Sequence, residues 1–428
     1  MKFTYLRKKY PQFIYEKYSW RKIKNNLAIS FDFRIKSITG QEIKFTPTLI
    51  VKNVSQKQIV GAGEGVLNNL IFNLGLIEMI SYWKATCSPE IIIQAGYLDN
   101  QQIKWWYDLI IKGMGQFFYE NKIDWRIKNF LKIISPTTSN SFPYKNYAIA
   151  EILYRRVLVP VSGGKDSIVN LELIKKRKNK KILCFSLNPT NTVREILKIA
   201  GCQKPIFVYR TIDPVLLKLN QRGFLNGHTP FSAYLAFLSV LIAVLFQCRS
   251  IPFANEKSAD EGNVKYLNQI INHQWSKSSE FEKKFQWYSQ HYLVKNIKYF
   301  SSLRRYSELE IAKMLIKYPQ YFSVFSSCNV VLAKKLKKRW CGQCPKCLFV
   351  YLLFYPFLDQ KTLLKIFNQD LLENKKLLPL LQQLLGKRGF KPFECVGTIK
   401  ETKKAIQLGL VKAKKTKKIP YLLQNLQI

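Results

Sequence analysis

The fold is decided at Arg156-Val157-Leu158-Val159-Pro160-Val161-Ser162-Gly163-Gly164-Lys165-Asp166-Ser167, where an apolar run meets two glycines and then a helical pattern. Residues 157–161 predict a buried strand, and residues 166–176 predict a helix. A turn of this kind leaves backbone N–H groups unpaired at the start of the helix, where they can bind a phosphate. The glycines allow close approach of the backbone, because a Cβ would block it. A strand–turn–helix without a ligand is the alternative interpretation.

Strands and helices continue to alternate after this turn. The sequence predicts strands at residues 182–187 and 205–209, with a helix at residues 192–200 between them. Short connections of this kind imply a parallel sheet, whose ligands gather at the carboxyl ends of the strands. Asn188 follows the second of the three strands, so we expect it at the same edge as the glycine turn, facing a bound nucleoside.

The first 145 residues contain no nucleotide motif. Residues 27–35 alternate between apolar and polar side chains and predict a half-buried strand, and residues 43–51 continue the β pattern. Residues 66–81 and 103–118 have helical spacing. A polar stretch at residues 136–141 marks a domain boundary. We therefore expect an α+β domain over residues 1–145, an α/β domain over residues 146–350 and a helical extension over residues 351–428.

Composition excludes a disordered chain and limits the partners. The 428 residues are 47% hydrophobic and 14% aromatic, and the net charge is +42. A nucleic-acid partner is nevertheless not expected, because the lysines are spread along the whole chain. The first nine residues have no apolar region, so we expect no secretory signal, a cytoplasmic location and reduced thiols. Residues 230–248 lack charge but are only about as long as the shortest membrane span, and we expect a buried helix there.

Two polar segments after the next predicted strand, residues 251–254, hold candidate catalytic groups. Glu256 belongs to a dense polar cluster at the ligand edge, where its carboxylate could bind Mg2+ or accept a proton. A surface loop with capping residues is an equally good interpretation of that cluster. His273 is one of only three histidines and stands close to Lys277. It could transfer a proton or be a structural, hydrogen-bonded histidine.

Four cysteines predict a metal site, namely Cys328, Cys341, Cys344 and Cys347. The last three have Cys-x2-Cys-x2-Cys spacing, and four thiolates close a tetrahedral coordination sphere, which favours structural zinc. An iron–sulfur cluster is the rival metal group. Most of the other cysteines are interpreted as buried small apolar residues. These are Cys87, Cys184, Cys202, Cys248 and Cys395.

The motifs also resemble known families. The sequence Ser-Gly-Gly-x-Asp-Ser resembles the pyrophosphate loop of enzymes that split ATP into AMP and pyrophosphate while they adenylate a substrate. The loop and the cysteine cluster are together similar to 7-cyano-7-deazaguanine synthases, but this chain is longer at both ends. Several segments resemble the UDP-N-acetylmuramoyl-L-alanyl-L-glutamate epimerase family of bacteria. They are residues 227–233, 255–259, 272–278, 340–347 and 391–397.

This last resemblance implies both a fold and a reaction. The fold is a doubly wound parallel sheet of the adenine-nucleotide alpha-hydrolase type with a zinc knuckle. The reaction, in peptidoglycan precursor synthesis, inverts the terminal L-Glu of UDP-MurNAc-L-Ala-L-Glu while ATP is converted to AMP and pyrophosphate. Adenylation removes the carboxylate charge, so the neighbouring Cα–H ionises more easily. The implied pyrophosphate-binding residues are Ser162, Gly163, Gly164, Asp166 and Ser167, with Mg2+ at Asp166 and with Lys165 neutralising the leaving group.

The sequence does not identify the two proton-transfer groups that an epimerase requires. Glu256, His273 and Lys277 are the candidates, and Tyr82 or Lys84 could reach in from the first domain. Another adenylating enzyme, such as a 7-cyano-7-deazaguanine synthase or a tRNA thiolase, is the main alternative. A zinc-stabilised nucleic-acid-binding protein is the second. Binding of tRNA would weaken steeply with salt. The sequence gives no indication of the oligomeric state.

Overall fold

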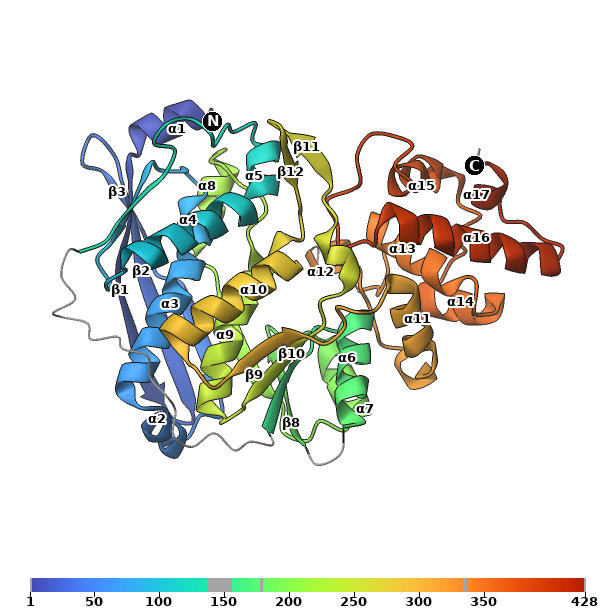
Figure 1. The fold of residues 1–428 in the computed structure, drawn as a ribbon, viewed down its shortest axis with the longest axis horizontal. Helices are drawn as coiled ribbons and strands as arrows, with labels where there is room; N and C mark the ends of the chain where they lie inside the picture. The colour runs from blue at the N-terminus through green and yellow to red at the C-terminus, as the bar shows by residue number, and fades with distance from the viewer. Residues whose placement is uncertain (1, 137–155, 178–179, 334–336, 427–428) are drawn as a thin grey trace.

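The computed structural model describes residues 2–136, 156–177, 180–333 and 337–426. An 11-stranded sheet forms its centre, in the order β13-β10-β7-β8-β9-β4-β2-β1-β5-β6, with β3 paired to β2 (Figure 1). The strands of the first half are β1 (Gln12–Ile23), β2 (Asn26–Lys36), β3 (Glu42–Phe45), β4 (Thr48–Lys52), β5 (Glu90–Ile93) and β6 (Lys132–Ile134). Those of the second half are β7 (Arg156–Pro160), β8 (Lys181–Leu187), β9 (Ile206–Thr211), β10 (Ser250–Phe253) and β13 (Lys298–Ser301).

The second half of the sheet is parallel, as the sequence predicts. β7 pairs in parallel with β8 on one side and with β10 on the other, and β9 and β13 extend the sheet outward. The chain thus continues to one side of β7 through β8 and later returns to its other side through β10. A crevice for a ligand forms at such a reversal of strand order, beyond the carboxyl ends of the strands. The Ser162–Ser167 loop follows β7 at this point.

Helices cover both faces of the parallel strands. Val157 and Val159 pack into one hydrophobic core with α6 (Lys165–Lys175), α7 (Asn191–Ile199) and α11 (Glu308–Ile316). Leu158 points to the other face, where the core contains α3 (Glu64–Trp83), α9 (Phe231–Leu245) and α10 (Ser279–Tyr288). The strand therefore buries side chains on both faces, which explains its continuous apolar sequence.

The strands of the first half join the same sheet. β4 pairs antiparallel with β9, so Leu49 lies opposite Arg210. The Arg210 guanidinium reaches across to α3, where both Glu78 carboxylate oxygens accept hydrogen bonds at 2.7 and 2.8 Å. The predicted domain boundary at residue 145 lies outside the described residues. Across the described part of the chain, one sheet connects the two halves.

Two predicted elements are each divided in two. Residues 43–51 form β3 and β4 rather than one strand, and Pro47, which has no N–H to donate to a ladder, lies between them. Residues 103–118 form α4 (Asn100–Gly113) and α5 (Gly115–Glu120) instead of one helix. The break follows Gly113, which packs closely against Pro230: a Cβ at Gly113 would lie 2.9 Å from the Pro230 Cβ.

The C-terminal part of the chain is helical, as predicted, and lies beyond α6 and α11 at one end of the molecule (Figure 1). Its helices are α13 (Pro345–Phe354), α14 (Gln360–Phe367), α15 (Leu378–Leu384), α16 (Ile399–Lys415) and α17 (Tyr421–Gln424). They share the core of α6 and α7. α9 is the buried helix expected at residues 230–248. In the described ranges no single helix could span a membrane, whereas α2 (Gln56–Ala62) and α3 together have sufficient length and apolarity but are bent by 87°.

The prediction that the scattered cysteines are reduced thiols is wrong for one pair. Cys184 in β8 and Cys202 after α7 form a disulfide, with their Cα atoms 6.3 Å apart. The helix α7 returns the chain to the side of β8, so the two residues meet although 18 positions separate them. Cys87 and Cys248 are free and buried, as expected, whereas Cys395 is half-buried.

Candidate active site

The glycine loop joins β7 directly to α6. Gly163 has a φ of +91°, a left-handed conformation that disfavours a side chain. Gly164 is extended and forms the N-cap of α6, whose first turn contains Lys165 and Asp166. The loop therefore places the N–H groups at the start of α6 at the carboxyl end of β7, a geometry suited to phosphate oxygens.

A distant segment, residues 326–328, braces the glycine loop. The Ser326 N–H donates to the Gly163 carbonyl at 3.2 Å, and the Lys165 N–H donates to Ser327 Oγ at 3.3 Å. A Cβ at Gly164 would lie 3.2 Å from Ser327 Oγ. A side chain at Gly164 would therefore crowd the brace, which also connects the loop to the first cysteine of the metal cluster, Cys328.

Lys165 points into the protein rather than into the crevice. Its Nζ is fully buried and donates to both Asp166 and Glu308. Burial acts to raise the pKa of Asp166, but Lys165, Lys346 and Lys277 outweigh it and keep that pKa low. Burial raises the pKa of Glu308 to about 7, against the attraction of the Lys165 ammonium. Lys165 thus holds the Asp166 carboxylate at the edge of the crevice.

A cavity of about 330 Å³ lies above the loop. It brings together most of the predicted nucleotide-binding residues, namely Ser162, Gly164, Asp166, Ser167 and Asn188. Its other walls are apolar side chains, including Phe185, Leu187, Phe231, Leu235 and Phe253. The Asn188 side chain exchanges two hydrogen bonds with the Arg210 backbone, so it positions the cavity wall instead of offering its amide to a ligand. Apolar walls beside a phosphate loop fit a purine nucleotide.

Lys277 lines this cavity and also contacts a second polar cluster. The Lys277 Nζ donates to the Cys395 sulfur at 3.4 Å, and the His273 Nε2 lies 4.0 Å from the same sulfur. Burial acts to lower the pKa of Lys277, but Cys395, Glu256 and Asp166 raise it overall. Burial, followed by the charge of Lys277, lowers the pKa of His273 to about 4. The lysine is therefore a cation and the histidine a neutral imidazole.

The other candidates surround this cluster or lie away from it. Glu256 is buried at the end of β10, and its carbonyl accepts from Arg304 at 2.8 Å. The Lys84 Nζ donates to the Gly227 carbonyl at 2.7 Å, next to His228, whose ring centroid lies 4.6 Å from that of His273. Tyr82 is enclosed in the core of the first half, where its hydroxyl accepts from the Asp213 N–H. Lys84 is thus close to the cluster, and Tyr82 belongs to the packing.

Sequence reasoning missed three residues of the site: Glu308, Lys346 and Cys395. The Lys346 Nζ donates to the Cys395 carbonyl and contributes to the low pKa of Asp166. Lys346 and Cys395 both occur in segments that the resemblance had already selected, residues 340–347 and 391–397. No pattern around Glu308 points to the site beyond a helix-capping box at Ser307.

The four predicted metal ligands come together in space. The sulfurs of Cys328, Cys341, Cys344 and Cys347 all lie within 4.8 Å of one another and are buried. Three of the sulfur–sulfur separations are 3.5, 3.7 and 3.9 Å, and a tetrahedron of sulfurs around zinc has edges of roughly 3.8 Å. Gly342 makes the turn with a φ of +73°, and Cys344 caps α13. The donor set and its spacing fit a structural zinc ion.

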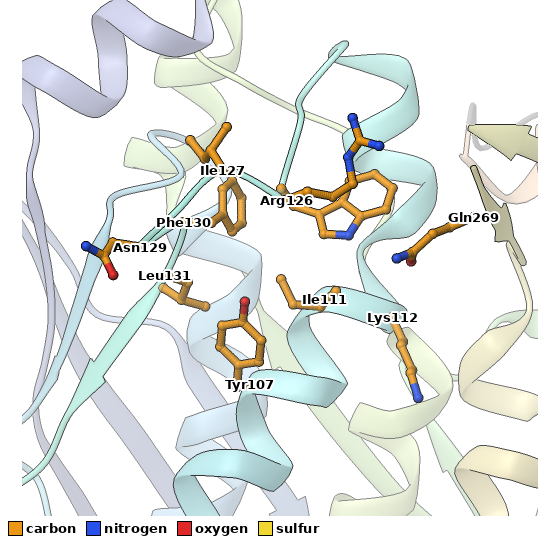
Figure 2. Close-up of a pocket in the computed structure, with 10 residues that line it drawn as sticks. Tyr107, Ile111, Lys112, Arg126, Ile127, Asn129, Phe130, Leu131 and Gln269 are labelled. Atoms are coloured by element: carbon orange, nitrogen blue, oxygen red, sulfur yellow. The ribbon is translucent and has the colours of Figure 1, made fainter. Parts of the chain in front are cut away.

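A larger cavity, of about 520 Å³, lies away from the loop between α4, residues 125–131 and β12 (Gln269–Ile271). Figure 2 shows the charged ends of Lys112 and Arg126 directed away from Tyr107 and Leu131. Both cations have carboxylate partners, since Lys112 pairs with Glu280 and Asp108, and Arg126 with Asp124. This cavity contains none of the loop residues and has no cation available for a phosphate.

Comparison with known proteins identifies the family of this chain. Residues 4–302 match the family model of the MurL N-terminal domain, and residues 324–427 match that of the MurL C-terminal domain. A protein of Micromonospora sp. is 32% identical over 380 residues, which cover 88% of this chain and 82% of that protein. A protein of Salinispora tropica is 34% identical over 343 residues, or 80% and 73% of the two chains. A third, from Xanthomonas oryzae pv. oryzae, is 32% identical over 352 residues, or 81% and 75%.

All three relatives are named UDP-N-acetyl-alpha-D-muramoyl-L-alanyl-L-glutamate epimerase. The matched residues include the glycine loop, the four cysteines and the segment around Cys395. The chain therefore belongs to the MurL family of epimerases.

Proposed function

We propose that this protein converts UDP-MurNAc-L-Ala-L-Glu into UDP-MurNAc-L-Ala-D-Glu and consumes ATP to AMP and pyrophosphate, as an isomerase of peptidoglycan precursor synthesis in the cytoplasm. The observation that carries the proposal is the cavity at the sheet's switch point, where the Ser-Gly-Gly-Lys-Asp-Ser loop meets apolar walls. The names of the relatives supply the substrate.

The first step is adenylation of the terminal α-carboxylate. The N–H groups of the loop and the N-terminus of α6 bind the pyrophosphate that leaves, and they stabilise its growing charge. The Asp166 carboxylate lines the cavity and offers the oxygen ligand that Mg2+ prefers, and Lys165 and Glu308 fix its position. Magnesium bound there would neutralise phosphate charge. The Lys277 ammonium also lines the cavity and would offset negative charge on the acyl phosphate.

Adenylation prepares the Cα–H for removal. The free carboxylate would place a full negative charge next to the carbanion, whereas the acyl-adenylate lets the electron pair move onto the carbonyl oxygen as an enolate. A proton is then returned to the opposite face, and water hydrolyses the acyl-adenylate to release AMP. Each turnover therefore consumes one ATP, and the free energy of that hydrolysis drives the otherwise balanced interconversion of L- and D-glutamate.

The test is an incubation of the full chain with ATP, Mg2+ and UDP-MurNAc-L-Ala-L-Glu. We expect D-Glu in the acid hydrolysate of the product, and formation of AMP and pyrophosphate only when the sugar peptide is present. Asp166→Asn should lose both products while the protein stays folded, because Lys165 keeps Glu308 as a charge partner. The epimerase is excluded, and another adenylating enzyme is favoured, if all the glutamate stays in the L form and AMP forms at the same rate with and without the sugar peptide.

A further inference from the structure

The segment at residues 391–397 places a thiol against Lys277, a residue that lines the cavity above the glycine loop. Several contacts hold this segment: the Lys346 Nζ donates to the Cys395 carbonyl, the Asn263 Nδ2 donates to the Pro392 carbonyl at 2.8 Å, and the Lys391 Nζ pairs with Glu261 at 2.9 Å. Because the backbone on both sides of Cys395 is fixed, its sulfur has a defined position.

The sulfur of Cys395 differs from the other free thiols of the chain. All nine cysteines lie in the described residues, and among the free ones only Cys395 is partly exposed. The Lys277 Nζ donates to this sulfur at 3.4 Å, and the His273 Nε2 lies 4.0 Å from it. An ammonium group at this distance stabilises negative charge that arises on the sulfur. The residue is therefore part of a polar triad rather than an apolar filler.

Lys277 links this triad to the site of adenylation. The same side chain that contacts the Cys395 sulfur lines the cavity with Ser162 and Asp166. The Cα of an adenylated glutamate is one bond from the carbonyl carbon that carries the phosphate. Lys277 therefore connects the wall of the cavity to the Cys395 sulfur, which lies 3.4 Å from its Nζ.

We propose that Cys395 is a catalytic residue of the epimerisation, which removes the Cα proton of the glutamyl-adenylate. This inference rests on the proposed function. The thiolate takes the proton and becomes a thiol, the C–H electron pair moves into the Cα–carbonyl bond, and the carbonyl oxygen becomes an enolate oxygen. A proton from water then adds to the opposite face, and the thiol returns its proton to the solvent through His273.

The neighbours of Cys395 fit accessory roles better than the role of base. The Lys277 amine is held as an ammonium and has no lone pair to accept a proton. The amide oxygen of Gln116 accepts from His273 Nδ1, which leaves the Nε2 lone pair facing the sulfur. His273 is thus placed to exchange a proton with the thiol. Lys277 and His273 are positioning residues in this arrangement, and Cys395 is the group that meets the substrate.

The test uses Cys395→Ala and Cys395→Ser in the full chain, with Cys248→Ala as the control for removal of a free thiol elsewhere. Each protein is incubated with ATP, Mg2+ and UDP-MurNAc-L-Ala-L-Glu in D2O. We expect both Cys395 variants to keep substrate-dependent AMP formation within a few-fold. Incorporation of deuterium at Cα and formation of D-Glu should fall by about 100-fold or more. Cys248→Ala should match the wild type in all three measurements.

Several results would overturn the proposal. Epimerisation that persists in Cys395→Ala excludes the thiol as the base, and loss of AMP formation in a folded variant assigns Cys395 to activation instead. A substrate-derived mass on Cys395 after acid quenching of the wild type would identify a thioester nucleophile. If the wild type forms AMP with the sugar peptide but no D-Glu, the proposed function itself is wrong, whatever the Cys395 variants do.

Discussion

Replacement of Gly163 by alanine tests whether the glycine loop binds ATP. The residue has a φ of +91°, and a left-handed conformation costs a non-glycine residue about 1–2 kcal/mol. A Cβ there would also lie 3.3 Å from the Val193 Cγ2 on α7, a tight contact that the Val193 side chain or the loop must relieve by a small movement. Loss of one hydrogen bond to a charged phosphate costs about 1.5–3 kcal/mol, which weakens ATP binding roughly 10- to 150-fold.

Gly40 offers a matched control in the turn between β2 and β3. Its φ is +81°, and a Cβ there would meet nothing within 4 Å. Gly40→Ala should therefore lose the same 1–2 kcal/mol of folding free energy as Gly163→Ala, by the same backbone cost, but leave ATP binding unchanged. Calorimetric titration with ATP and thermal unfolding of both variants separate the two effects. If Gly163→Ala binds ATP like the wild type, or if Gly40→Ala weakens binding equally, the loop assignment is wrong.

Three further predictions concern stability. Metal analysis should find about one zinc per chain, and Cys344→Ser should lose the metal and melt at a lower temperature, because a closed four-thiolate site contributes folding energy. Glu78→Gln leaves the guanidinium of Arg210 buried without its charge partner and should cost about 3–5 kcal/mol in denaturant unfolding. Burial lowers the pKa of His228 to about 3 and that of His273 to about 4, so the unfolded chain binds more protons below pH 6.5. Stability should be full above that pH and should fall towards pH 4, by about 3 kcal/mol at most per histidine, as followed by melting temperature against pH.

The elements predicted correctly are those whose own residues carry a strong local pattern. β7 has a continuous apolar run because both of its faces are buried, and α9 has no charge because helices and sheet enclose it. β1 was missed, since the side chains in its second half alternate only between half-buried and exposed, which weakens the period-two signal. β13 carries little signal of its own, since it is four residues long and has a single buried residue, Tyr299.

The residues of the site also differ in how well a local sequence pattern predicts them. The cysteine quartet was predictable because most of its ligands lie within one short turn, and coordination chemistry dictates their spacing. The Cys395–His273 contact joins residues 122 positions apart, so no local pattern contains it. Lys165 is a second case in which a distant residue matters. Its place in the loop suggests contact with phosphate, but in the structure its ammonium donates to the carboxylate of Glu308, 143 residues away.

The cysteine cluster connects the two halves of the proposed reaction. On one side, Cys328 continues the segment whose Ser326 and Ser327 brace the glycine loop. On the other side, Lys346 lies between Cys344 and Cys347 and holds the carbonyl of Cys395. A metal ion bound by the four sulfurs would therefore help to fix both the loop to which we assign phosphate binding and the thiol to which we assign proton transfer. Removal of the metal should consequently impair epimerisation even where the sheet stays folded, because the cluster segment contacts both the loop and the Cys395 backbone.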